Sequence, residues 1–292
     1  MTRKVLLSTL TALGLAAVIA LAVSRPGLTA QSKKVFIITD MEGVDGIFDE
    51  DLQCVPWKSP RWEESRKLLT GETNAAVDGL YEGGATEVVV LDGHWSGSNL
   101  SVADINPKAR LLTGSVPRTF TLDNSYSAMI FIGQHAMAGA EKGILGHTES
   151  PEGIHNVWVN STPVGEIGLN LMVAASFGIP TIMLSGDTAA CKELQGLVPQ
   201  AECAEVKSGV SRTGGLMLAH SVACALIRDK CRRAMQKLGE FKPYQVSEPV
   251  EIKVEYTAIG TREMPPREGV QRLDDRTWSI RGKNFMDAWY KF

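Results

Sequence analysis

Several carboxylate and imidazole side chains stand immediately after apolar runs of the chain. Asp40 and Glu42 follow "KVFIIT", and His94 follows "EVVVL". His135 follows "MIFIG", and Glu166 comes directly after "TPVG", where a helical pattern begins. Taken singly, an acid in such a place is usually a helix cap or a loop residue, and a lone histidine is usually structural. Together, imidazole and carboxylate ligands without thiolate are typical of a site for zinc or a similar divalent ion.

The number of these side chains indicates how many ions they hold. Five protein ligands are too many for one tetrahedral zinc that keeps a position open for water or substrate. If one carboxylate bridges, the same five ligands form two open sites at about 3.5–4 Å, the spacing of two-metal hydrolases. Asp92, two residues before His94, is a candidate partner that orients an imidazole. We expect His155 and His220 to be structural.

Short apolar runs alternate with helical patterns from residue 33 onward. The run at 34–39 has no polar alternation, which predicts a strand buried on both faces. Strands that alternate with helices predict parallel pairing with right-handed crossovers, and therefore a three-layer α/β fold. Ligands of such sheets bind beyond the carboxyl ends of the strands, where the candidate ligands stand. The predicted strands are 34–39, 86–92, 109–114, 127–133 and 179–187, and the predicted helices are 59–81 (capped at Ser59–Pro60), 166–178 and 188–198.

The later part of the chain has a less regular pattern. Two short strands are predicted around a turn at 160–162. Residues 209–238 have a helical pattern, residues 249–258 alternate as a strand does, and "WSIRGKNFMDAWYKF" predicts a final strand and a short helix. We expect a smaller α+β portion at the C-terminus. The pattern leaves open whether residues 246–292 form a subdomain or a swapped edge.

The first thirty residues differ in kind from the rest. Two basic residues at positions 3 and 4 precede an uncharged apolar run over residues 5–23, and small residues end the segment at position 30. This order is typical of an export signal. The run is almost long enough to span a bilayer, so an uncleaved membrane anchor through residues 5–23 is the alternative. We therefore predict an exported protein, periplasmic or extracellular, whose residues 33–292 form one domain.

Charge and cysteine content exclude other classes of protein. A formal net charge of -3, without a basic stripe, argues against a nucleic-acid partner. Five cysteines without a CxxC motif argue against a thiolate zinc site. In an exported protein Cys191 can pair with Cys203, or Cys224 with Cys231, and the odd number leaves at least one cysteine unpaired.

Five segments of the sequence together resemble one peptidase family. "TDMEG", "LDGHWSGSNL", "FIGQHAM", "GILGHTES" and "VNSTPVGEIGLN" are similar, in order and approximate spacing, to the D-aminopeptidases associated with dipeptide transport operons, the M55 peptidases. The resemblance implies two zinc ions per chain, bridged by Asp40. It implies that Glu42 and His94 complete the protein ligands of one ion, and His135 and Glu166 those of the other. It also implies that His147, in "LGHT", is catalytic, and that the chain assembles into rings.

The predicted function is therefore that of an exported zinc-dependent aminopeptidase. We expect short peptides as substrates, with an N-terminal D-amino acid such as D-alanine. One alternative is a two-metal hydrolase of another amide or of an ester, including a phosphoester. A second is a zinc-binding or peptide-binding protein without turnover. An acid or oxyanion donor such as His147 argues against the second, because binding alone does not need one.

Overall fold

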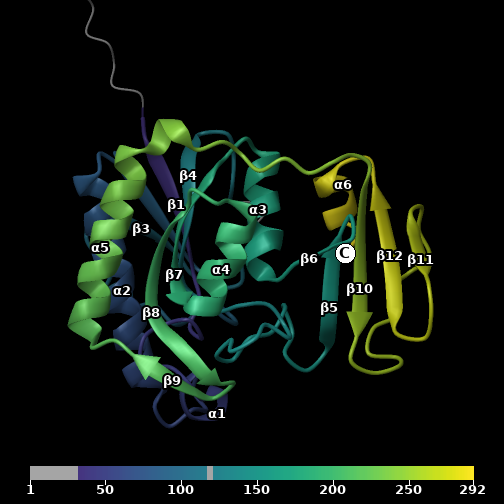
Figure 1. The fold of residues 1–292 in the computed structure, drawn as a ribbon, viewed down its shortest axis with the longest axis horizontal. Coiled ribbons are helices and arrows are strands. Elements are labelled where there is room, and N and C mark those ends of the chain that lie inside the picture. Colours follow the sequence, from purple (N-terminus) through teal and green to yellow (C-terminus); the bar gives the residue numbers. More distant parts are fainter. Residues whose placement is uncertain (1–31, 117–120) are drawn as a thin grey trace, which may run out of the picture. The chain divides into compact units, whose positions relative to one another are not determined.

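A seven-stranded sheet forms the centre of the fold (Figure 1). The computed structural model describes residues 32–116 and 121–292, and the predicted export signal or anchor at residues 1–30 lies outside them. All neighbouring strands pair in parallel except the last two. In spatial order the strands are β3 (Ala109–Leu112), β2 (Glu87–Asp92), β1 (Lys34–Thr39), β4 (Tyr126–Gln134), β7 (Thr181–Asp187), β8 (Glu202–Ser211) and β9 (Gly214–Met217).

Helices cover both faces of this sheet, which confirms the predicted three-layer α/β fold. Helices α2 (Trp62–Glu82) and α5 (His220–Gln236) pack together on one face, and α3 (Glu166–Ser176) and α4 (Thr188–Leu197) lie on the other (Figure 1). Because it is covered on both sides, β1 is buried along almost its whole length, as its unbroken apolar run predicts. The shorter helices are α1 (Glu50–Gln53) and the 3-10 turn η2 (Leu238–Glu240).

The C-terminal strands join an earlier hairpin in a second, five-stranded sheet. Its order is β11 (Val270–Arg272), β12 (Thr277–Gly282), β10 (Val250–Tyr256), β5 (Ile154–Val159) and β6 (Thr162–Pro163), all antiparallel, and α6 (Phe285–Trp289) packs against it. The predicted turn at 160–162 is confirmed, because Asn160 and Ser161 both have positive φ, the geometry of a two-residue hairpin turn. The smaller C-terminal α+β portion is therefore confirmed.

Two sequence-based expectations outside the site were wrong, and the two cysteine pairings that the sequence left open are not formed. Residues 209–217 form the end of β8 and all of β9 rather than helix, and a Cβ on Gly209 would lie 1.9 Å from the Lys142 carbonyl oxygen. The Ser59 hydroxyl does not cap α2 but donates to the Asp51 carbonyl at 2.6 Å. All five cysteines are free thiols, so neither pairing forms. Among the described residues, no helix is long and apolar enough to cross a membrane.

Candidate metal centre

The predicted ligands meet where the order of the central sheet reverses. From β1 the chain passes to β2 on one side and later returns to β4 on the other side of β1. The loops after β1 and β4 therefore diverge, and they leave a crevice beyond the carboxyl ends of these strands. The five predicted ligands come from the ends of β1, β2 and β4 and from the start of α3: Asp40, Glu42, His94, His135 and Glu166.

A close crossing of two backbones holds the first of these loops in place. The Asp40 N–H donates to the Ile132 carbonyl of β4 at 2.9 Å, and the Gly43 N–H donates to the Gly133 carbonyl at 2.7 Å. A Cβ on Gly43 would lie 2.1 Å from the Gln134 carbonyl oxygen, so only glycine allows this approach. The crossing places the carboxylates that follow β1 beside the histidine that follows β4.

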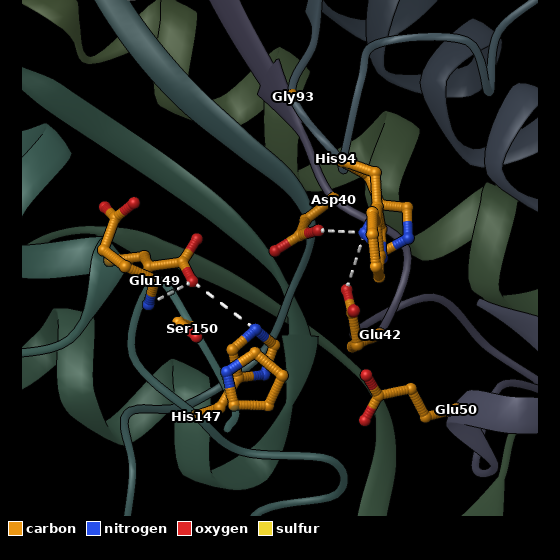
Figure 2. A pocket seen from close by; sticks show the side chains of 11 residues that line it. Asp40, Glu42, Glu50, Gly93, His94, His147, Glu149 and Ser150 are labelled. Carbon is orange, nitrogen blue, oxygen red and sulfur yellow. Dashed lines mark hydrogen bonds and ion pairs between the residues drawn. The ribbon is translucent and has the colours of Figure 1, made fainter. Parts of the chain in front are cut away.

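The acidic and imidazole groups form two adjacent sets, each compact enough to hold a metal ion. Figure 2 shows the first set, in which His94 faces both Asp40 and Glu42. In the first set, His94 Nδ1 lies 3.0 Å from Asp40 Oδ1 and 3.1 Å from Glu42 Oε2. The second set comprises His135, His147 and Glu166. Its two imidazole Nε2 atoms lie 3.5 and 3.6 Å from Glu166 Oε1.

Asp40 connects the two sets through its two carboxylate oxygens. Oδ1 faces His94 of the first set, and Oδ2 lies 3.3 Å from His135 Nε2 of the second. The Gln134 amide donates to Oδ2 at 2.9 Å, and the Met41 N–H donates to Oδ1 at 2.9 Å. Both oxygens are thus fixed in orientation, each toward a different histidine.

Backbone carbonyls determine which nitrogen of each histidine faces the carboxylates. His94 Nε2 lies 2.8 Å from the Cys54 carbonyl, and His135 Nδ1 lies 2.9 Å from the Ala136 carbonyl. A carbonyl accepts only, so these nitrogens carry hydrogen. In the neutral imidazole, the opposite nitrogen then presents its lone pair to the carboxylates, which is unfavourable unless a cation or proton lies between them.

The charges of the site favour such a cation. Burial by itself would lower the pKa of His94, but Glu42 and Asp40 outweigh burial and raise this pKa well above its usual range. The pKa of His135 is raised in the same way, by Glu166 and Asp40 against burial. Burial would raise the pKa of Asp40, but hydrogen bonds with the two histidines hold it well below its usual range. The site therefore stabilises positive charge between its carboxylates.

The donor set fits zinc. Two of its buried atoms, Glu42 Oε2 and His135 Nε2, make no hydrogen bond with the described residues. Each lies only at ion-pair distance from the opposite kind of group, 3.1 Å from His94 Nδ1 and 3.3 Å from Asp40 Oδ2 respectively. Buried polar atoms are normally paired, so atoms without a partner at this position indicate a ligand. Neutral imidazole and carboxylate are the oxygen and nitrogen donors that zinc accepts.

The orientation of His147 differs from that of the other histidines. Its ring stacks on the His135 ring, with centroids 3.9 Å apart and planes inclined by 19°. Because the two rings are stacked with nearly parallel planes, the in-plane lone-pair directions of their nitrogens do not converge on one point. His147 is therefore a poor second ligand for an ion held by His135, although Nε2 of His147 faces the same cavity.

Asp92 does not have the role expected of it. Its carboxylate accepts hydrogen bonds from the Asn99 and Leu100 N–H groups and from the Asn99 side chain, and it orders the loop after β2. Only the Asn99 amide links it to His94, through the His94 carbonyl rather than the ring. His155 is exposed, and His220 pairs with Asp45 at 3.1 Å, so neither belongs to the site.

Two further residues that the sequence analysis missed hold the ligand loops. The Lys207 ammonium of β8 is 3% exposed and donates to the carbonyls of Glu42, Val44 and Ile47. Burial lowers the pKa of Lys207 to about 8, so the ammonium form still predominates at neutral pH. Glu193 of α4 accepts from the N–H groups of Met137 and Gly165, next to two of the ligands. The sequence analysis missed Lys207 because the end of its strand, β8, was predicted to be helix.

An open α/β sheet with buried imidazole and carboxylate donors at its switch point defines a metal-dependent enzyme. The family model of the D-aminopeptidases, peptidase family M55, matches residues 33–292, and the chain belongs to this family. A curated D-aminopeptidase of Bacillus subtilis (strain 168) is 32% identical over 264 residues, which are 88% of this chain and 94% of the relative. The resemblance found in the sequence is thus confirmed.

A solved structure has the same fold. It is described as the zinc-dependent D-aminopeptidase DppA from Bacillus subtilis, a self-compartmentalizing protease. It superimposes with a TM-score of 0.82 and 29% sequence identity, over 88% of this chain and 94% of that chain.

Proposed function

We propose that this metallopeptidase is a two-zinc aminopeptidase that removes an N-terminal D-amino acid, such as D-alanine, from short peptides. The observation that carries the dinuclear assignment is the position of Asp40, whose two oxygens face histidines of two different donor sets. With Asp40 as the bridge, Glu42 and His94 hold one ion, and His135 and Glu166 hold the other. When bound, the zinc ions supply Lewis acidity and lower the pKa of water toward neutrality.

His147 supplies the proton chemistry in this proposal. Its Nδ1 is held by the Leu145 carbonyl at 2.9 Å, and its Nε2 faces the cavity beside Glu166. Because Nδ1 carries the hydrogen that the Leu145 carbonyl accepts, Nε2 presents a lone pair in the neutral imidazole. Once Nε2 has taken up a proton from the attacking water, it can stabilise the oxyanion that forms at the scissile carbonyl and pass that proton to the departing amine. The His147 ring stacks on the ring of His135, a predicted ligand. In this proposal His147 therefore lies beside the scissile bond without binding an ion itself.

The charge of the cavity favours a peptide over a phosphoester. Its lining includes five carboxylates and, among the described residues, no lysine or arginine. A phosphate would bring further negative charge to a site without the arginine or lysine groups that usually bind it. A peptide amide brings no negative charge at the scissile bond. Hydrolysis of an amide therefore agrees better with the acidic lining of the cavity than hydrolysis of a phosphoester does.

Location and assembly form part of the same proposal. The order of charged, apolar and small residues in 1–30 supports export, either with cleavage or with residues 5–23 kept as an anchor. Peptides from cell-wall turnover, which contain D-alanine, are then accessible substrates. The relative described as a self-compartmentalizing protease supports a homo-oligomer, with a ring as the proposed form.

Metal content and substrate preference together test the proposal. The protein is equilibrated with limiting zinc and analysed by plasma mass spectrometry, and is then assayed with D-alanyl and L-alanyl dipeptides and a phosphoester. We expect two zinc equivalents per chain and cleavage of the D-alanyl substrate. One equivalent or none in folded protein would exclude the dinuclear site. Zinc-loaded protein that binds D-peptides without cleaving them would identify a binding protein instead.

A further inference from the structure

The cavity at the donor sets is lined by two carboxylates, Glu50 and Glu149, that are not among the predicted metal ligands. Its volume is about 340 Å³, and its five carboxylates belong to Asp40, Glu42, Glu50, Glu149 and Glu166. Among the described residues of the lining there is no lysine or arginine, so a cationic group of a ligand meets mainly acidic side chains there.

Glu50 is the carboxylate whose position has no explanation within the protein. It is half-buried, and its side chain makes no hydrogen bond or ion pair with any described residue. Figure 2 shows its carboxylate near that of Glu42, at the edge of the cavity. Glu50 is not needed to cap α1, because the Asp49 side chain already accepts from the Leu52 N–H at 2.9 Å. A helix of four residues also has too small a dipole to require an acid there.

The backbone fixes Glu50 relative to the metal ligands. The Glu50 carbonyl accepts from the Cys54 N–H at 2.9 Å and from the Ser59 hydroxyl at 3.2 Å. The Cys54 carbonyl in turn holds the His94 ring at 2.8 Å. One short turn therefore orients His94, a predicted ligand, and also fixes the backbone that carries Glu50 relative to it.

We propose that Glu50 is a specificity-determining residue that binds the α-ammonium group of the substrate's N-terminal residue. This inference rests on the proposed aminopeptidase function. An aminopeptidase must distinguish a free N-terminus from an internal peptide bond, and a carboxylate without a partner beside the metal site provides that distinction. The charged hydrogen bond from the ammonium to Glu50 replaces the hydrogen bonds to water that the ammonium loses when the substrate enters the cavity. The C-terminal carboxylate of a peptide finds no lysine or arginine among the described residues of the lining.

Replacing Glu50 by glutamine tests the assignment, because it removes the charge and keeps the shape. The probe is D-alaninol, which has the amine and no scissile bond, and its dissociation constant is measured by calorimetry on zinc-loaded protein. A charged hydrogen bond corresponds to a weakening of roughly tenfold to a hundredfold. We expect Glu50→Gln to weaken D-alaninol binding by about tenfold or more, and Glu50→Asp to recover part of it. Asp51→Asn is the matched control, because Asp51 lies on the same helix, is exposed and does not line the cavity.

Kinetics on two substrates provide the second measurement. With D-alanyl p-nitroanilide, Glu50→Gln is expected to raise KM by about tenfold with little change in kcat, whereas the slow cleavage of the deaminated propionyl analogue stays unchanged. Zinc content must equal that of the wild type.

Unchanged D-alaninol binding in Glu50→Gln would overturn the inference and leave the proposed function intact, because the amine would then bind elsewhere, for example to an ion. Loss of zinc would also overturn it, since Glu50 would then support the metal site. If wild-type protein cleaved no D-alanyl substrate, the proposed function would fail, and the calorimetry would still decide the role of Glu50.

Discussion

Replacing Lys207 by methionine should damage the metal site from a distance. Lys207 lies on β8 and is not a ligand, but its ammonium holds three carbonyls of the loop that contains Glu42. Methionine has a similar length and fits an apolar environment, so the change removes three donors without leaving a large cavity. The loop of residues 40–47 then loses its attachment to the sheet edge at β8.

The size of the effect follows from the number of acceptors. The bonds to Val44 and Ile47 measure 2.9 and 2.6 Å, and the third acceptor is the carbonyl of Glu42 itself. A buried acceptor that loses its donor costs about 1–3 kcal/mol. Water can reach some of the three after the loop relaxes, so the free energy of unfolding should fall by roughly 3–5 kcal/mol. Zinc affinity should fall by about 10- to 100-fold, as is usual when a group that supports a ligand is removed.

Two assays measure these effects separately. Denaturant unfolding of the metal-free protein gives the stability, and competition with a chromophoric chelator gives the zinc affinity. Lys192→Met is the matched control, because Lys192 is exposed on α4, and both quantities should stay at the wild-type level. If Lys207→Met has wild-type stability within about 1 kcal/mol, a difference smaller than one lost acceptor would cause, and binds zinc as tightly, the three hydrogen bonds do not hold the loop.

Three other perturbations separate the roles of single residues. His147→Ala should keep its zinc and lower kcat by roughly 100-fold or more, as measured by steady-state kinetics beside metal analysis, since His147 supplies a proton rather than a ligand; undiminished turnover would remove it from the mechanism. Asp40→Asn should lose at least one zinc equivalent by plasma mass spectrometry, because an amide lacks the charge that joins two dications, and full occupancy at wild-type affinity would exclude a bridge. Burial raises the pKa of Glu193 to about 7. The native state therefore binds this proton more tightly than the unfolded chain does. The extra free energy of unfolding that this provides is fully present below about pH 4.3, and it is lost as the pH rises through 7. Relative to Glu193→Gln, wild-type protein should therefore lose about 3 kcal/mol of unfolding free energy between pH 4.5 and 8, and parallel pH profiles in chemical denaturation would contradict this pKa.

Local sequence patterns predict much of the fold. The unbroken apolar runs of β1, β2, β4 and β7 predict buried parallel strands, because a strand covered by helices on both faces has no polar side. Residues 209–217, in β8 and β9, were wrongly predicted to be helical because their glycines and small residues show no clear hydrophobic period. Only the close approach of Gly209 to the Lys142 carbonyl shows why that segment is extended.

Local sequence patterns were enough to predict which groups form the candidate site. All five predicted ligands follow strands or begin a helix, and parallel strands bring their carboxyl ends to one edge whatever the details of packing. His147 lies in the loop between β4 and β5, and only its motif indicated a role. Motif order then identified the family, since the ligands sit in short segments with fixed neighbours.

The tertiary structure decided how these groups are held and oriented. Asp40 faces two histidines with its two oxygens because its loop crosses the end of β4, a contact between residues more than ninety positions apart. Lys207 and Glu50 acquire their roles in the same way, from elements that only folding brings to the cavity. Ligand identity is a property of short segments, but the direction of a lone pair or a carboxylate depends on long-range packing that no local pattern records.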